Sequence, residues 1–288
     1  QRVSAENRVK RGSMSFDNFR KIIDQFELCD RLGLSGGEPF VNKDCLRILE
    51  YARSRGIACH VTTNFLKIGE KDYDTVFDNV HEIEISIDGC TKETYEKIRK
   101  NGSFEKIVHG LEVFMNRYAE KSDPFLKTIR AHYVVNQHNL HEVVDFVSFM
   151  ANLGIKNIIF IPYSSSKINP VPAELDASLV LEKNDIQDLY EDVKSRADEL
   201  SVNIGSFLNN SSLFSRFCDC DWYKENLWVT WQGYVTPCCV IDNPRIFNFG
   251  NLLEQSLSEI YNGQKWRNFR WRLFNNDPPQ ECRDYCAI

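Results

Sequence analysis

The chain has 288 residues, with 41 acidic and 35 basic side chains and a formal net charge of −6. This length is typical of one large domain, or of one domain with a small appendage. Hydrophobic residues make up 42% and charged residues 26%, which excludes wholesale disorder. No apolar run approaches the roughly 20 residues that cross a bilayer, and no strongly basic block suggests a nucleic-acid partner. We therefore expect a globular protein that binds neither membrane nor nucleic acid.

The first 160 residues alternate helical patterns with short apolar runs. Ser15 is placed to cap a helix that continues to about Cys29. Strands are expected at 32–34, 57–62, 81–87, 128–135 and 157–161, with helices at 43–55, 70–77, 91–99, 104–118 and 140–153 between and beside them. This alternation predicts an α/β fold with a parallel sheet, either doubly wound or a partial barrel.

The second half of the chain changes character. Residues 164–178 contain Pro170 and Pro172 and are expected to be a crossing segment, and a polar helix is expected at 183–200. Residues 227–235 alternate around Gln232 and Gly233, which predicts a β-hairpin. We therefore divide the chain into a core at 1–163, a connecting segment and helix at 164–203, and a cysteine-rich part at 204–288.

Polar residues and glycines follow the expected strands. Because the carboxyl ends of parallel strands gather functional groups, these residues are candidates for one site. Glycines let a ligand approach the backbone, an acidic side chain can bind ribose, and Arg can pair with a carboxylate. An amino-acid-bearing nucleoside would suit that set, although Gly-Gly-Glu-Pro alone could be a simple turn. The set comprises Gly36-Gly37-Glu38-Pro39, Thr62-Thr63-Asn64, Ser86, Asp88, Arg99, Arg130 and Asn136.

Histidines contribute less to this interpretation. Five of the six show no metal-ligand spacing and are expected to be solvated or core residues, namely His60, His81, His109, His138 and His141. His132 shares a strand with Arg130 and is a weaker candidate for the site.

Ten cysteines are distributed unevenly. Four are isolated and are expected to be small buried hydrophobes, whereas six lie after residue 217. The hairpin would bring Cys238 beside Cys220, and Cys282 and Cys286 lie one helical turn apart. Such a set could hold an iron–sulfur cluster or a tetrahedral zinc, which the spacing does not distinguish.

Disulfide bonds in a secreted protein are a third interpretation of these cysteines. Asn-x-Ser/Thr triplets at Asn101, Asn209 and Asn210 would fit secretion. Four isolated cysteines elsewhere would then be exposed to an oxidising compartment as free thiols. We therefore expect a reduced, cytoplasmic protein.

Taken together, the motifs at the strand ends resemble those of the radical S-adenosylmethionine (SAM) superfamily. The resemblance is carried by Gly36-Gly37-Glu38-Pro39, by Thr-Thr-Asn at 62–64, and by Ile85-Ser86-Ile87-Asp88-Gly89. The tail resembles the short form of the SPASM extension, through Cys220, the 231–239 segment, Gly250-Asn251 and the 282–286 segment. The resemblance covers about residues 14–286. It implies a partial (β/α)6 barrel, with a small hairpin-plus-helix auxiliary iron–sulfur domain at 204–288.

The resemblance also implies a set of SAM-binding residues. The glycine segment would hold the methionine amino group. Ser86, Asp88, Arg99 and Arg130 are candidates for the ribose and the carboxylate, and Asn136 and Ile161 would lie near the adenine. The full expected set is Gly36, Gly37, Glu38, Pro39, Thr63, Asn64, Ser86, Asp88, Arg99, Arg130, Asn136 and Ile161.

For the tail, the resemblance implies one auxiliary [4Fe–4S] cluster bound by Cys220, Cys238, Cys282 and Cys286, with Cys218 and Cys239 as alternates. The family binds its catalytic [4Fe–4S] cluster through a Cys-x3-Cys-x2-Cys motif upstream of the Gly-Gly-Glu-Pro strand. The 288 residues contain no such motif. We expect this motif and the first barrel strand in sequence that precedes Gln1.

The implied activity is reductive cleavage of SAM to a 5′-deoxyadenosyl radical that abstracts hydrogen from a substrate. The substrate class stays open between a peptide and a small molecule, and a flavodoxin- or ferredoxin-type protein would donate electrons. The alternative is a cluster-free binding module of similar fold with a structural zinc at the C-terminal cysteines.

Overall fold

The computed structural model describes residues 12–163, 178–179, 181, 183–205, 219–220 and 222–285. The chain forms two compact units. The sheet unit comprises the described residues within Cys29–Ser164 and Glu174–Asn210, and the cysteine-rich unit comprises those within Gln1–Leu28 and Ser211–Ile288. In the described parts, no helix combines the length and apolar character needed to cross a membrane.

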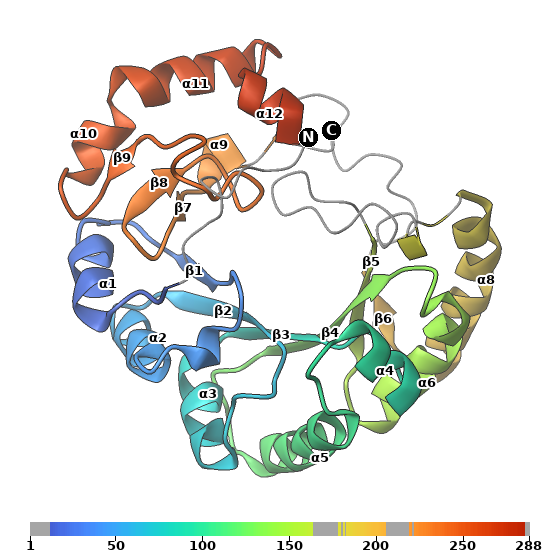
Figure 1. The fold of residues 1–288 in the computed structure, drawn as a ribbon. Coiled ribbons are helices and arrows are strands. Elements are labelled where there is room, and N and C mark those ends of the chain that lie inside the picture. The colour runs from blue at the N-terminus through green and yellow to red at the C-terminus, as the bar shows by residue number, and fades with distance from the viewer. Residues whose placement is uncertain are drawn as a thin grey trace. The chain divides into compact units, whose positions relative to one another are not determined.

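The sheet unit contains six parallel strands whose spatial order follows the chain (Figure 1). Each crossover therefore joins neighbouring strands, as in a barrel. The five predicted strands are confirmed to within two residues, whereas the short β6 was not predicted. The strands are β1 (Arg31–Leu34), β2 (Ala58–Thr63), β3 (Glu82–Ser86), β4 (Thr128–Val135), β5 (Asn157–Pro162) and β6 (Asn203–Ile204).

Helices lie along the outside of this sheet (Figure 1). Side-chain caps begin two of them: Thr91 accepts from the Thr94 N–H, and Ser103 accepts from the Lys106 N–H. The helices are α2 (Cys45–Ser54), α3 (Tyr73–Asn79), α4 (Lys92–Ile98), α5 (Phe104–Glu120), α6 (Val143–Asn152) and α8 (Lys183–Leu200), with 3-10 turns η2 (Pro39–Val41), η3 (Glu70–Asp72) and η4 (Leu140–Glu142).

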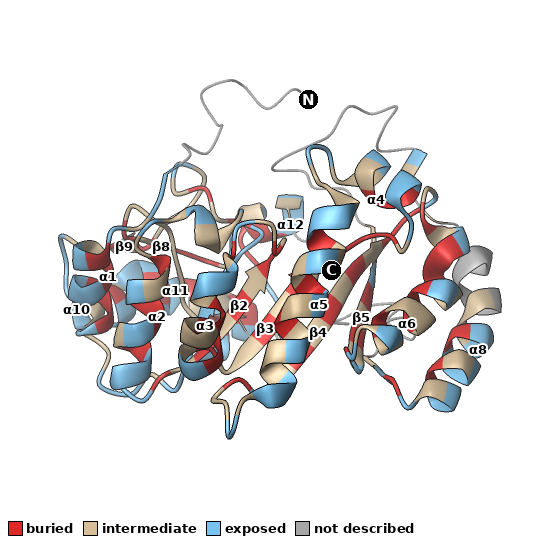
Figure 2. Cartoon of the chain, turned by 90° about the horizontal axis from the view of Figure 1, so that it is seen from below, coloured by how far each residue is buried: buried red, intermediate tan, exposed pale blue. Residues whose placement is uncertain are grey.

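The two faces of the sheet differ in chemistry. Alternate residues of the strands, such as Ile83, Ile85 and Tyr133, are fully buried, and buried stretches run along β3 and β4 (Figure 2). The alternate residues of β2, β3 and β4 point to the opposite face, called the inner face below, and are only half-buried. This periodicity leaves the polar residues of the strands on the inner face.

The cysteine-rich unit is built around a three-stranded antiparallel sheet. The predicted hairpin is confirmed as β7 paired with β8. Gly233 has φ +88°, and a Cβ there would lie 2.5 Å from Asn251 Oδ1, so the turn requires glycine. The elements are α1 (Phe16–Ile23), α9 (Trp222–Glu225), β7 (Trp228–Val229), β8 (Tyr234–Thr236), β9 (Gly250–Asn251), α10 (Leu257–Tyr261), α11 (Gln264–Phe274) and α12 (Gln280–Tyr285).

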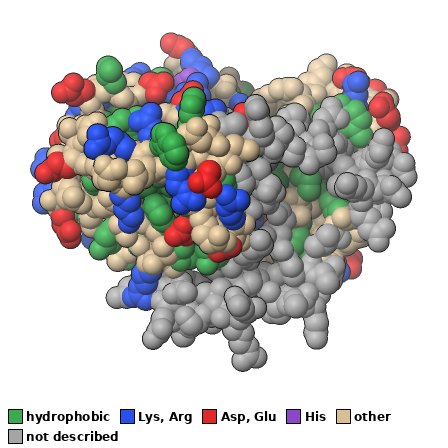
Figure 3. Space-filling model, turned by 90° about the horizontal axis from the view of Figure 1, so that it is seen from above, with side chains coloured by type: hydrophobic (Ala, Val, Ile, Leu, Met, Phe, Trp, Pro, Cys, Tyr) green, Lys and Arg blue, Asp and Glu red, His purple; other side chains and the backbone are tan. Residues whose placement is uncertain are grey.

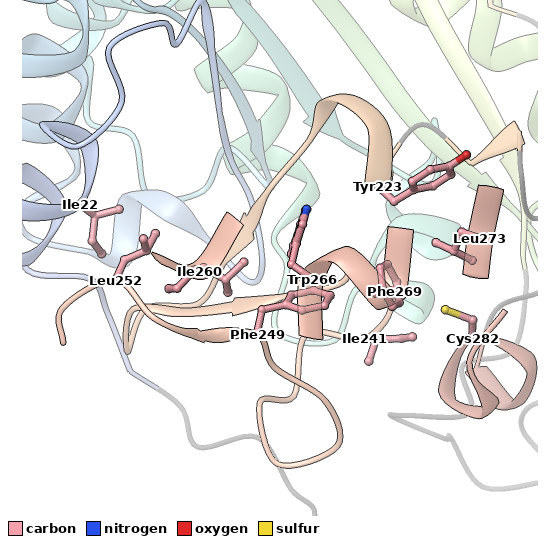
Figure 4. Close-up of a cluster of buried hydrophobic side chains, with 11 residues drawn as sticks. Ile22, Tyr223, Ile241, Phe249, Leu252, Ile260, Trp266, Phe269, Leu273 and Cys282 are labelled. Carbon is pink, nitrogen blue, oxygen red and sulfur yellow. The ribbon is translucent and has the colours of Figure 1, made fainter. Parts of the chain in front are cut away.

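Helix α1 packs with the C-terminal elements. Its Ile22 belongs to the same buried cluster as Leu252, Ile260 and Trp266 (Figure 4). Just after the helix, the Gln25 side chain donates to the Leu252 carbonyl at 2.8 Å and accepts from the Leu257 N–H at 2.8 Å. The helix ends at Ile23, earlier than expected. The domain division at 163 and 204 stays a prediction, and this packing associates α1 with the tail.

Candidate functional site

The glycine turn after β1 is joined to the turn after β2 by the carboxylate of Glu38. Its Oε1 accepts from Thr63 Oγ1 at 2.7 Å and from the Phe40 N–H at 3.1 Å, and its Oε2 accepts from the Asn64 N–H at 2.7 Å. The Glu38 side chain is therefore committed to positioning the backbone. The peptide groups of Gly36 and Gly37 are the exposed part of this turn.

The backbone conformation explains the paired glycines. Gly36 and Gly37 have φ of +90° and +98°, a region that other residues rarely adopt. A Cβ at Gly37 would meet nothing within 4 Å. The conformation, rather than crowding, requires glycine at position 37, and open space lies beside the turn.

The turn after β2 is stabilised by its own side chains. Thr63 is only 1% exposed, and its Oγ1 accepts from the Phe65 N–H at 2.9 Å while donating to Glu38. Asn64 accepts from the Leu66 N–H at 3.0 Å through its side-chain oxygen. Thr63 thus acts as a buried anchor for the Glu38 carboxylate.

Asp88, after β3, links two further elements. Its carboxylate accepts from the Val134 N–H at 2.7 Å and pairs with Arg99 Nη2 at 2.8 Å, and the residue is only 4% exposed. The Arg99 side chain is 25% exposed, but its Nε–H is buried and has no hydrogen-bond partner among the described residues. Asp88 therefore orients a guanidinium group that retains an unused donor.

The expected adenine-side residues have different surroundings. Asn136 is buried in the turn after β4, where its backbone N–H donates to Asn139 Oδ1 at 2.7 Å and its side-chain oxygen accepts from the His138 N–H at 2.9 Å. Ile161, near the end of β5, is 41% exposed. Ile161 thus offers an apolar surface, while the Asn136 side chain shapes a turn.

Arg130 lies in a group of inner-face residues that the sequence reasoning did not assemble. Its guanidinium contacts the Glu82 carboxylate and lies 3.7 Å from Glu84. Glu84 also pairs with His60 Nε2 at 3.2 Å and accepts from Thr62 Oγ1 at 3.3 Å. We call His60, Thr62, Glu82, Glu84 and Arg130 the inner-face cluster. Alternation of polar residues on three consecutive strands was the signal that could have revealed it.

The charges of the inner-face cluster favour an ion-pair network over a metal site. Ligand atoms of His60, Glu82 and Glu84 lie within 4.8 Å of one another, a spacing that a metal ion could use. Arg130 already brings a positive charge to both carboxylates. Burial raises the pKa of Glu84, but the hydrogen bond and charge of His60, the charge of His132 and the Thr62 hydroxyl outweigh it, so the net pKa is lowered.

His132 faces the same side of the sheet, in register with Ser86. Burial lowers its pKa, although the nearby carboxylates of Glu84 and Asp88 act in the opposite direction. A neutral imidazole therefore lies beside Ser86 at pH 7.

Three of the four described cysteines of the tail adjoin one core. Cys282 is buried within it (Figure 4), and Cys220 and Cys238 pack against it. Of the two adjacent cysteines, Cys239 is exposed and Cys238 is half-buried, so Cys238 is the better candidate for a cluster ligand. Thiols are the donors that iron–sulfur clusters and zinc sites use, and the sharing of one centre by these cysteines stays a prediction. Cys218 and Cys286 lie outside the described residues.

Comparison with protein families agrees with this arrangement. The model of the radical SAM superfamily matches residues 2–161, more than half of the chain, and that of the SPASM iron–sulfur cluster-binding domain matches residues 218–287. The chain therefore belongs to the radical SAM superfamily and carries a SPASM domain.

Curated relatives are distant. A probable GTP 3′,8-cyclase of Methanocaldococcus jannaschii is 24% identical over 74% of this chain and 70% of its own length. A probable GTP 3′,8-cyclase of Saccharolobus islandicus is 26% identical, and the match spans only 42% of that protein. A tungsten-containing aldehyde ferredoxin oxidoreductase cofactor-modifying protein of Pyrococcus furiosus is 21% identical over 96% of this chain and 80% of its length.

Solved structures show the same fold. Histidine-tagged anSMEcpe with bound AdoMet superposes with a TM-score of 0.70 at 18% identity, covering 98% of this chain and 77% of that one. Streptococcus suis SuiB bound to the precursor peptide SuiA superposes with a TM-score of 0.69 at 17% identity, covering 92% and 62%. These likenesses support the fold class of a radical SAM barrel with a small antiparallel C-terminal sheet.

Replacing the Glu38 carboxylate by an amide should loosen the two joined turns. In Glu38→Gln, one acceptor oxygen becomes a donor that faces N–H and O–H donors, at a cost of about 1–3 kcal/mol in unfolding free energy. Hydrogen exchange at the Asn64 amide should accelerate correspondingly. Glu50→Gln, on the exposed face of α2, should change stability by less than about 0.5 kcal/mol. Unchanged Asn64 exchange in Glu38→Gln would contradict the linkage.

The buried His132 should make stability depend on pH. Its native pKa is lowered below the usual 6.5, so unfolded chains bind more protons below about pH 6.5. Unfolding free energy should therefore fall as pH drops below about 6.5, until the native pKa is passed. Urea unfolding at several pH values should show a flatter profile for His132→Gln than for the wild type. The exposed His109→Gln should keep the wild-type slope, and equal slopes in all three proteins would contradict the shift.

Proposed function

We propose that this protein is a radical SAM enzyme that cleaves SAM reductively and abstracts a hydrogen atom from a peptide or small-molecule substrate. The observation that carries the proposal is the Glu38-held glycine turn, which exposes the peptide groups of Gly36 and Gly37 at the carboxyl end of a radical SAM sheet. Exposed peptide groups in that position suit the amino group of an amino acid.

Groups at the ends of β3, α4 and β5 divide the binding of SAM among them. The Arg99 side chain is 25% exposed and its guanidinium is oriented by Asp88, so it suits the methionine carboxylate. Ser86 is only half-buried and offers its hydroxyl to the ribose. Ile161 supplies apolar surface for the adenine.

The buried members of the expected set position these groups. Glu38 and Thr63 hold the first two turns together, and Asn64 closes the second. Asp88 holds Arg99, and Asn136 shapes the turn after β4. Arg130, engaged with Glu82 and Glu84, belongs on the substrate side of the proposed site.

Iron–sulfur clusters would supply the redox chemistry. A reduced [4Fe–4S] cluster on a Cys-x3-Cys-x2-Cys motif would provide the electron that splits SAM into methionine and a 5′-deoxyadenosyl radical. In the tail, Cys220, Cys238, Cys282 and Cys286 would hold one auxiliary [4Fe–4S] cluster. Four thiolates fill the coordination of such a cluster, which favours electron transfer or structural support.

The substrate would meet the inner-face cluster. Its histidine, carboxylates and guanidinium offer both donors and acceptors, so they suit a polar substrate. Among the similar proteins, SuiB is bound to a precursor peptide, and several curated relatives are named for GTP. We keep both a peptide and a small polar molecule within the proposal, with a flavodoxin- or ferredoxin-type electron donor.

Formation of 5′-deoxyadenosine tests the proposed activity. Full-length protein with reconstituted clusters, reduced with dithionite under anaerobic conditions, should convert SAM to 5′-deoxyadenosine, measured by chromatography and mass spectrometry. Ser86→Ala should raise KM for SAM about 10-fold, equivalent to about 1.4 kcal/mol, because one hydrogen bond to the ribose is lost.

A matched control is Ser54→Ala, since Ser54 is exposed at the end of α2 and should retain the wild-type KM. If reconstituted protein forms no 5′-deoxyadenosine, the enzymatic proposal fails. If the product forms but Ser86→Ala behaves like Ser54→Ala, only the role of Ser86 is rejected.

A further inference from the structure

Helix α11 has two faces with different partners. On its inner face, Trp266, Phe269 and Leu273 are buried in the core of the cysteine-rich unit. The Trp266 ring lies 4.2 Å from that of Phe249, centroid to centroid. These three residues are spaced three and four positions apart, so they form one apolar stripe that packs α11 onto the core. The residues of the opposite face are therefore not needed to hold the helix in place.

The opposite face combines aromatic and basic residues. Arg267, Arg270, Trp271 and Phe274 follow one another at intervals of three, one and three residues, which places them on one side of the helix. Trp271 is 65% exposed and Phe274 is 74% exposed. The Arg270 guanidinium lies 5.0 Å from the ring centre of Tyr261, which is itself exposed. We call these five residues the aromatic–basic face.

The charge of α11 is opposite to that of the whole chain. Its eleven residues include Lys265, Arg267, Arg270 and Arg272 and no acidic residue, whereas the chain has a net charge of −6. Arg272 pairs with Asp277. Arg267 and Arg270 form no ion pair with any carboxylate in the described parts of the chain. Figure 3 shows the side of the molecule on which α10, α11 and α12 lie, where hydrophobic side chains are interspersed with Lys and Arg.

We propose that the aromatic–basic face is the docking site of an acidic electron-transfer protein. Such a partner would be repelled by most of a chain of charge −6 and attracted to this basic helix, so charge would orient the encounter. Exposed Trp, Tyr and Arg are the residues that contribute most to protein interfaces. Trp271 and Phe274 add two large exposed aromatics on the same helix face, and such groups are found at interaction sites.

The position of α11 connects this face to the tail cysteines. Leu273, on the inner face, belongs to the same buried cluster as Cys282 (Figure 4). Cys220 and Cys238 pack against that cluster. One helix, about 10 Å thick, thus separates the aromatic–basic face from the core that the cysteines adjoin. Resting on the proposed function, the step would be transfer of one electron: the donor would lose one electron to the auxiliary cluster held by the tail cysteines, and that electron would pass on to the cluster that cleaves SAM.

Binding to a purified acidic flavodoxin tests this docking site without requiring activity. Isothermal titration calorimetry with the full chain should show binding that weakens as salt rises. The double variant Arg267→Glu/Arg270→Glu and the variant Trp271→Ala should each weaken binding at least 10-fold. Circular dichroism and thermal unfolding should show that both remain folded, because the substituted side chains lie outside the core.

The matched control is Arg20→Glu/Lys21→Glu, which makes the same charge change on exposed residues of α1 in the same unit. This control should bind within about 2-fold of the wild type. Equal losses in the two double variants would overturn the docking site in favour of a general charge effect. Dimer formation abolished by Trp271→Ala would overturn it in favour of a second copy, and tighter binding to DNA than to flavodoxin would assign the face to nucleic acid.

A comparison of electron donors separates this proposal from the proposed function. With dithionite, Arg267→Glu/Arg270→Glu should produce 5′-deoxyadenosine at the wild-type rate. With reduced flavodoxin as the donor, its rate should fall at least 10-fold. If wild-type protein fails with dithionite, the enzymatic proposal fails while the binding measurement still decides the docking site. If the variant keeps its full rate with flavodoxin, the docking proposal is overturned.

Discussion

The carboxylate of Glu38 joins two turns that leave neighbouring strands of the sheet. Thr63 Oγ1 and the Asn64 N–H both donate to it at 2.7 Å, and the glycine turn that precedes it can then keep its exposed peptide groups in place. A buried or half-buried carboxylate that accepts several hydrogen bonds is a strong and directional link. The geometry of the proposed SAM site depends on this link, because Gly36 and Gly37 have no side chains through which they could be held.

A similar division of tasks recurs around the ends of the strands. Asp88 is buried, and its carboxylate accepts a hydrogen bond from the backbone of β4 and forms an ion pair with Arg99. The Arg99 Nε–H has no hydrogen-bond partner among the described residues. Asn136 likewise uses its polar atoms within its own turn. Buried polar groups of this kind must be satisfied within the protein, so they rigidify the site. The groups left for a ligand are backbone amides, one guanidinium and one hydroxyl, which are the groups that need the most exact placement.

Much of the fold could be predicted from periodicity, because strands such as 128–135 alternate clearly and helices such as 183–200 have long polar patterns. The motif Gly-Gly-Glu-Pro also indicated a backbone site. The partners of its glutamate could not be predicted, since Thr63 and Asn64 are 25 and 26 residues away along the chain. The contacts of Arg130 with Glu82 and Glu84 could not be predicted either, because they depend on the pleat and the register, and its role toward SAM stays a prediction. The strand β6 has only two residues, which is too short for a periodic pattern. The exposed face of α11 could be identified only from the structure, which shows which of its residues are buried.

A metal count tests most directly whether the tail cysteines hold a redox-active iron–sulfur cluster. The 288-residue chain, purified and reconstituted under anaerobic conditions, should contain about four irons and four sulfides per chain, as one [4Fe–4S] cluster requires. Cys282→Ala should lose most of this iron, whereas Cys59→Ala, in the core of the sheet unit, should retain it. One zinc per chain with no iron would contradict the account and support the cluster-free binding module.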